Sequence, residues 1–180
     1  MPTCIAFLRA VNVGGRTVKM DLLRAEFEAL GLAEVRSFIA SGNVVFTTRA
    51  RDLAALERRI EQRLHAAFGF EIETFVRTRA ELAAIVAHPA FDAAEAAAAA
   101  THVIGFIGTA PGAEALSAVA AFTTAHDRFH LHERELHWLS ALRQSDSTFS
   151  NAAFERALRT RATFRSITTL RKLLATLPDA

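Results

Sequence analysis

The sequence predicts an α+β protein made of two duplicated ferredoxin-like (βαββαβ) subdomains, each with an antiparallel sheet and extra helices. Three observations predict this class. The chain has 180 residues, 51% of them hydrophobic, which suffices for two small domains. Apolar runs typical of strands alternate with amphipathic stretches in the order β-α-β-β-α-β. A second series in the same order follows, which indicates a structural duplication.

The first half supplies four strands and two helices, followed by an extra helix. We expect strands at residues 3–9, 34–40, 44–48 and 70–77. We expect helices at 20–30 and 52–68, because apolar residues recur there at helical spacing and a glycine follows each stretch. Ser41-Gly42-Asn43 separates two β-rich runs and predicts a hairpin turn. The extra helix at 79–88 ends before Pro89.

The second half repeats this order after a connector rich in alanine. We expect strands at residues 102–108, 128–133, 135–142 and 161–164. Helices are expected at 113–125, 150–158 and 166–177, with Ser150 as an N-cap. The predicted domains are therefore residues 1–90, a subdomain with an extra helix, and 102–180, a subdomain with a C-terminal helix. Residues 91–101 are the predicted connector.

Composition limits the classes of protein that fit this chain. The 21 basic and 19 acidic residues nearly balance, so net charge is weak support for nucleic-acid binding. Cys4 is the only cysteine, which excludes an internal disulfide and a cysteine-rich zinc site. Its apolar neighbours predict a small buried residue. Residues 96–113 are uncharged, but Pro111, three glycines and many alanines argue against a transmembrane helix. We expect a cytoplasmic protein without membrane contact or cofactor.

Two polar loops meet at one end of the first predicted sheet. In the βαββαβ topology, the loop after the first strand, the hairpin turn at 41–43 and the turn at Gly69 lie at that end. Consecutive Gly14 and Gly15 would let backbone N–H groups approach an anion, at the positive end of the following helix. Basic and polar side chains that could contribute are Arg9, Asn12, Arg16, Lys19, Ser41 and Asn43. The alternative is a tight turn that Asn12 and Asn43 brace by bonding to the backbone.

These same residues carry a family resemblance. The segments FLRAVNVGGRTVKM, LGLAEVRSFIASGNVVF and TFRSITTLRKL resemble the bacterial family of domain of unknown function 1697, in order from Phe7 to Leu173. The resemblance implies two ferredoxin-like subdomains and no established activity. Recurrent family positions fall at Arg9, Asn12, Gly14, Gly15, Lys19, Ser41, Gly42, Asn43, Thr163, Arg165, Thr169 and Lys172. The sequence departs from the family pattern at Ala10 and at Ser166-Ile167, where glycine and Asn-Trp are usual.

The C-terminal segment is a second candidate binding surface. Ile167, Leu170, Leu174 and Leu177 form one apolar stripe of the predicted last helix, which places Arg165, Thr169 and Lys172 on the opposite face. Six cations and no acidic residue lie between Arg156 and Lys172. They could meet a phosphate backbone, but the first and third strands lack the paired aromatic residues of an RNA-recognition sheet. An ordinary cationic helix is the preferred interpretation.

Three histidines form the sharpest metal hypothesis. His130 and His132 alternate with apolar residues and so share one strand face. A tight turn at Arg134 would place His137 opposite or diagonal to His132, with facing Cβ atoms about 4.5–5.5 Å apart, close enough to share a zinc ion. This spacing is no recognised zinc pattern, so imidazoles on a wet or interdomain sheet face are the preferred interpretation and no metal is favoured.

Binding of a small anionic ligand, phosphate- or nucleotide-like, is the leading prediction for function. It places the ligand at Gly14-Gly15 and Ser41-Gly42-Asn43, with Arg165, Thr169 and Lys172 as further candidates. The alternatives are a nucleic-acid-binding module that uses the basic C-terminal segment, and a protein-interaction domain without a ligand. The sequence contains no Gly-x-Ser-x-Gly motif for a nucleophilic serine and leaves open both catalysis and oligomeric state.

Overall fold

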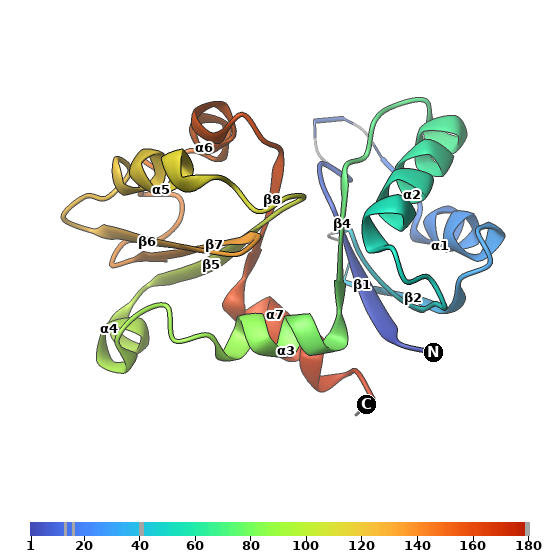
Figure 1. Cartoon of the computed structure of the whole chain (residues 1–180), viewed down its shortest axis with the longest axis horizontal. Helices are drawn as coiled ribbons and strands as arrows, with labels where there is room; N and C mark the ends of the chain where they lie inside the picture. Colours follow the sequence, from blue (N-terminus) through green and yellow to red (C-terminus); the bar gives the residue numbers. More distant parts are fainter. Residues whose placement is uncertain (13, 16, 40–41, 179–180) are drawn as a thin grey trace. The chain divides into compact units, whose positions relative to one another are not determined.

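A computed structural model describes residues 1–12, 14–15, 17–39 and 42–178, and it contains two four-stranded antiparallel sheets with helices (Figure 1). Contacts between Cα atoms divide the chain into two units. The first unit contains Met1–Ala83 and the C-terminal residues from Leu173 onward, and the second contains Ala84–Lys172. The predicted α+β class with two ferredoxin-like units is confirmed.

The first unit has the strand order of the split βαβ arrangement, β2-β3-β1-β4. Its elements are β1 (Thr3–Leu8), α1 (Met20–Ala29), β2 (Ala33–Phe38), β3 (Asn43–Thr47), α2 (Leu53–Phe68) and β4 (Thr74–Thr78). Every neighbouring pair of strands is antiparallel. Helices α1 and α2 lie on the same face of this sheet (Figure 1). The helix α3 (Arg79–Ala87) follows β4 directly.

Alternate residues of β1 form the centre of the first core. Cys4, Ala6 and Leu8 are buried in one cluster with Phe27 of α1 and Ile60 of α2. Burying a large aliphatic or aromatic side chain of this kind stabilises the fold by about 1.5–3 kcal/mol. The thiol of Cys4 is fully buried, as expected for a small apolar residue.

The second unit repeats the same strand order, β6-β7-β5-β8. Its elements are α4 (Ala93–Ala98), β5 (Thr101–Ile107), α5 (Ala113–Ala120), β6 (Asp127–His132), β7 (Glu135–Ser140), α6 (Asn151–Leu158) and β8 (Ala162–Ser166). The last helix is α7 (Ile167–Ala175). Helices α5 and α6 lie on one face of the sheet (Figure 1). Ser150 caps α6 as predicted, because its hydroxyl accepts a hydrogen bond from the Ala153 amide.

The core of the second unit combines aliphatic and aromatic side chains. Phe154 of α6 and Val119 of α5 pack with Ile107 and Leu136 of the sheet. Gly105 of β5 lies opposite Phe164 of β8, and the Phe164 ring lies where a side chain at position 105 would stand. Because Phe129 and Leu131 of β6 pack into this core, His130 and His132 lie on the other face of the sheet.

Several element boundaries differ from the predicted ones. Strand β4 begins at Thr74 rather than at residue 70, and α5 ends at Ala120 rather than at 125. Strand β8 continues through Arg165, which pairs with Ile104 of β5, so Arg165 does not belong to the last helix. The helix starts one residue after Ser166, whose hydroxyl accepts a hydrogen bond from the Thr169 amide. That cap fixes the end of the strand and the start of the helix.

The predicted domain boundaries remain a prediction about which segments fold independently. The predicted connector at residues 91–101 contains α4, which buries no side chain. Across the described ranges, the structure has no helix with the length and the apolar character needed to cross a membrane.

Candidate functional site

The predicted meeting of three connections at one end of the first sheet is confirmed. The Leu8 amide donates to the carbonyl of Gly42 over 2.8 Å, which ties the end of β1 to the β2–β3 turn. The Arg9 amide donates to the carbonyl of Glu73 over 2.9 Å, which ties it to the α2–β4 connection. We call this end of the first unit the loop end.

Two of the predicted site residues brace the loops with their side chains. The Asn12 side-chain oxygen accepts a hydrogen bond of 2.7 Å from the amide of buried Val18, across the loop that contains Gly14 and Gly15. The Asn43 side-chain amide donates to the Phe38 carbonyl over 3.1 Å, and Asn43 is 1% exposed. These contacts agree with the alternative interpretation, in which both asparagines brace a tight turn by bonding to the backbone. Asn12 and Asn43 therefore hold the loops in position.

Gly42 also has a structural role. Its φ is +74°, and a Cβ at this position would lie 3.2 Å from the Leu8 Cβ and 3.4 Å from the Val11 Cβ. A side chain at residue 42 would be strained at this φ and would displace its neighbours by a few tenths of an ångström, so glycine suits the packing of the hairpin turn on the end of β1. Ser41, the first residue of the predicted Ser41-Gly42-Asn43 turn, lies outside the described residues, as does Arg16.

The charge of Arg9 is already matched by a carboxylate. Its guanidinium lies 3.3 Å from Glu73, which also lines a hollow of about 470 Å³ with Glu61 and Glu71. Burial raises the pKa of Glu61, against a hydrogen bond from the Thr74 amide that lowers it. Glu61 and Glu71 add negative charge to this hollow beyond the Arg9–Glu73 pair, which disfavours anions there.

The α1 side combines features that favour an anion with one carboxylate: Asp21 lies in the first turn of α1, where it pairs with Arg24. Gly14 and Gly15 have φ of +63° and +83°, and no atom of the described residues lies within 4 Å of the position of a Cβ at either residue. Exposed Lys19 is the N-cap residue of α1, and no side-chain hydrogen bond caps this helix among the residues described. The N–H groups of a first helical turn attract anions when no side chain satisfies them.

The three predicted C-terminal residues belong to the second unit, and their environments differ. The Arg165 guanidinium donates to the Thr163 hydroxyl and to the Phe164 carbonyl, and burial lowers the pKa of Arg165 to about 10. Thr169 and Lys172 lie on α7, where Lys172 is exposed. Arg161 lies 3.6 Å from the carboxylate of Glu155. Two cations of the basic segment are thus directed to acceptors within the protein.

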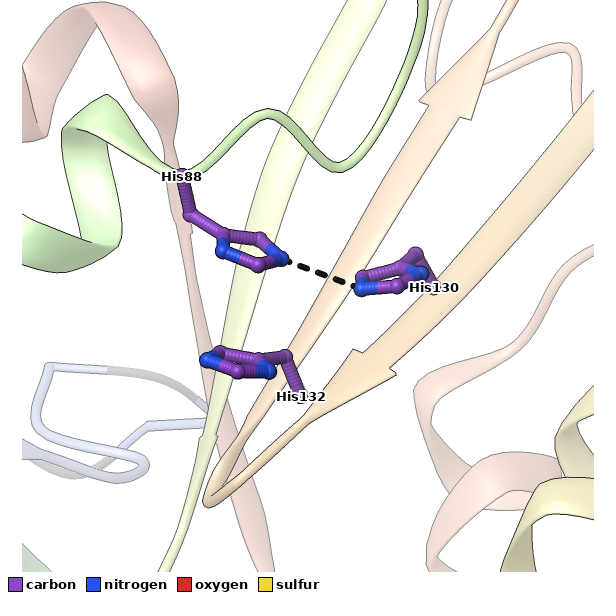
Figure 2. A group of neighbouring side chains, drawn as sticks. All are labelled: His88, His130 and His132. Atoms are coloured by element: carbon purple, nitrogen blue, oxygen red, sulfur yellow. Dashed lines mark hydrogen bonds between the residues drawn. The ribbon is translucent and has the colours of Figure 1, made fainter.

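The sheet of the second unit brings the predicted histidines together and adds another. His130 pairs with His137 and His132 pairs with Glu135, so His137 is diagonal to His132. His88, which follows α3, reaches this face: its Nε2 lies 3.0 Å from Nε2 of His130, and its ring stacks on His132 with 4.0 Å between centroids (Figure 2). We call His88, His130 and His132 the histidine cluster. Sequence reasoning missed His88, which is 42 residues from His130.

His137 lies beside the histidine cluster in an unusual environment. It is 1% exposed, and its ring centroid lies 5.2 Å from that of His88 and 6.1 Å from that of His130. Neither ring nitrogen has a hydrogen-bond partner in the described part of the chain. Burial, together with the charges of the four nearby imidazoles, lowers the pKa of His137 to about 3. His137 is therefore neutral at neutral pH.

A family profile described as "Protein of unknown function (DUF1697)" matches residues 1–137. The chain belongs to this family. The match includes the loop end and the histidine cluster, whereas Thr163, Arg165, Thr169 and Lys172 lie beyond it. A comparison with curated proteins found no match.

One solved structure supports the fold of this DUF1697 protein over its whole length. The conserved bacterial protein SP0830 from Streptococcus pneumoniae is 21% identical in sequence, with a TM-score of 0.72 and 98% of each chain covered. At this identity the likeness shows a shared fold. The shared fold assigns no function, which has to be inferred from the residues of the chain itself.

Proposed function

We propose that this DUF1697 protein binds a small anionic ligand, phosphate- or nucleotide-like, on the α1 side of the loop end. One observation carries the proposal: α1 begins at Met20 without a side-chain cap among the described residues, directly after the loop that contains Gly14 and Gly15. The positive end of the helix dipole and the exposed ammonium group of Lys19 both favour a negative charge there.

The two glycines support the proposal through their backbone geometry. The left-handed φ values of Gly14 and Gly15 mark a tight turn, and turns of this kind can gather backbone N–H groups into a concavity that binds anions. No described residue fills the space beside either Cα atom, so a ligand has room to approach the backbone. Asn12, Gly42 and Asn43 hold the loop and the hairpin turn in place, so we assign them positioning roles.

Two substitutions with matched controls test this site. Lys19→Ala removes a charge beside the site, and Arg49→Ala removes one exposed charge after the opposite end of β3. Gly15→Ala adds a Cβ to the loop, whereas Gly31→Ala adds one at a similar left-handed φ of +78° after α1, also in open space. Both glycine variants carry a similar backbone strain of about 1 kcal/mol, so a difference in binding reflects the site.

Binding of inorganic pyrophosphate and of ATP, measured by isothermal titration calorimetry, is the test. We expect saturable binding by the wild-type chain, and affinities lowered about fivefold by Lys19→Ala, as expected for a loss of roughly 1 kcal/mol. Gly15→Ala should also weaken binding, while Arg49→Ala and Gly31→Ala should bind like wild type. Equal affinities in all five proteins would contradict the proposal. Binding only to random oligonucleotides, with a steep salt dependence, would instead favour the nucleic-acid alternative.

A further inference from the structure

We propose that the histidine cluster of His88, His130 and His132 binds one divalent transition-metal ion of the zinc class. This site lies within the second unit and is independent of the anion site proposed for the first. Strand β6 supplies two of the ligands on one face, and the chain leaving α3 supplies the third (Figure 2).

The distances between the imidazoles are close to those of a metal site. One ring nitrogen from each of the three histidines can be chosen so that all three atoms lie within 4.8 Å of one another. Two nitrogens bound to one tetrahedral Zn²⁺ at 2.0–2.1 Å are about 3.3 Å apart. The 3.0 Å between Nε2 of His88 and Nε2 of His130 differs from this by only a few tenths of an ångström. Rotation of exposed His132 would complete the set.

Buried His137 is an independent observation that points to the same place. A buried imidazole that makes no hydrogen bond costs roughly 1–3 kcal/mol, and native structures rarely keep such a group without a functional reason. His137 pairs directly with His130 across the β6–β7 ladder. This side chain therefore lies against the proposed ligands, with two ring nitrogens that find no partner among the described residues.

The protonation states also suit metal binding. Burial and the neighbouring imidazoles lower the pKa of both His88 and His130 from the usual value for histidine, which favours the neutral rings. Neutral imidazole is the form that binds metals. Without a metal, one Nε2 donates its proton to the other across the 3.0 Å contact. With a metal, the donating ring takes the tautomer protonated at Nδ1, and both Nε2 lone pairs face the ion.

The ligand types select the class of ion. The cluster offers three imidazole nitrogens and no carboxylate, a set that suits Zn²⁺, Ni²⁺ or Cu²⁺ and is poor for Mg²⁺ or Ca²⁺, which prefer oxygen. Three imidazoles leave a fourth tetrahedral position for water or an added ligand.

Zinc binding by the full chain, purified without a histidine tag, tests the site. Zn²⁺ is titrated in competition with a chelating dye into wild type, His88→Ala, His132→Ala and His126→Ala. His126 is an exposed histidine of the same unit outside the cluster, so its variant is the matched control. Trp138 of β7, the only tryptophan, reports by fluorescence that each variant is folded.

We expect wild type and His126→Ala to bind one equivalent of zinc, and the two cluster variants to bind at least about tenfold more weakly. Cobalt bound to wild type should show the strong visible absorption of tetrahedral coordination, and His132→Ala should lose it. The proposal is overturned if wild type binds no zinc, if both cluster variants bind as tightly as wild type, or if His126→Ala weakens binding as much as they do.

Discussion

Asp127 anchors the β6–β7 hairpin that carries three histidines, and its replacement by alanine should destabilise the second unit strongly. The carboxylate is 2% exposed at the start of β6. One oxygen accepts hydrogen bonds from the Trp138 indole N–H at 2.9 Å and from the Ser147 hydroxyl at 3.0 Å. The other accepts from the Thr124 hydroxyl at 3.0 Å.

The magnitude follows from what each donor does after the change. Trp138 is 1% exposed, so Asp127→Ala leaves its N–H buried without this acceptor, at a cost of about 1–3 kcal/mol. Thr124 is exposed and Ser147 half-buried, so both hydroxyls regain part of their bonding from water. We expect a total loss of about 3 kcal/mol. Asp127→Asn keeps an acceptor for Trp138 and should lose about 1 kcal/mol, the difference between charged and neutral hydrogen bonds.

Urea unfolding followed by Trp138 fluorescence measures both losses, because the chain has no other tryptophan. Asp146→Ala is the control, since Asp146 is exposed and pairs with exposed Arg143, and it should change stability by less than about 1 kcal/mol. If Asp127→Ala unfolds at the same urea concentration as Asp146→Ala, the carboxylate does not anchor this hairpin and the reasoning is refuted.

Three further predictions concern acid stability, packing and thiol reactivity. Burial raises the pKa of Asp127, but hydrogen bonds from Trp138 and neighbouring hydroxyls outweigh this effect and hold the pKa below its usual value. The carboxylate therefore stabilises the fold above the unfolded-state pKa, and this stabilisation is lost as the pH falls through the folded-state pKa. Below about pH 4 the urea midpoint should fall more steeply for wild type than for Asp127→Asn, and parallel curves would disprove this prediction. Gly105→Ala would place a Cβ 2.6 Å from the Phe164 ring and should lower the free energy of unfolding by about 1–3 kcal/mol, measured by thermal unfolding. Gly108→Ala, whose Cβ would meet no described atom within 4 Å, is the control and should lower it by less than half as much. Burial, reinforced by the charge of Glu81, raises the pKa of the Cys4 thiol to about 11. A thiolate-specific reagent at neutral pH should therefore modify buried Cys4 only as the protein unfolds. Rapid labelling of the folded chain would contradict this prediction, because it would show that the thiol is accessible.

The elements that the sequence predicted well are those with a local signal. Helix α2 begins after Asp52, whose side chain caps it, and ends at Gly69, which has a left-handed φ. Both signals act within one helical turn, so they can be read from the local sequence. Topology predicted that the connection after β1 and the hairpin turn lie at the same end of the sheet, and the hydrogen bond between Leu8, at the end of β1, and Gly42 confirms this.

The sequence could not predict contacts between residues that are far apart along the chain and meet only in the folded structure. Arg9 and Glu73 are 64 residues apart, so no spacing rule indicates that a carboxylate neutralises this arginine. His88 approaches His130 only because the chain leaving α3 crosses the sheet face that carries the histidines. The sequence predicted a position on the last helix for Arg165, because an apolar stripe at helical spacing begins at Ile167. No local pattern indicated that Arg165 pairs with Ile104 in the sheet.

The most direct test of the proposed function is a titration of the ¹⁵N-labelled protein with inorganic pyrophosphate, followed by amide chemical shifts. We expect saturable shifts at Gly14 and Gly15 and in the first turn of α1, with small changes at Gly31 at the other end of that helix. An unchanged spectrum, or shifts confined to the second unit, would contradict the proposed function.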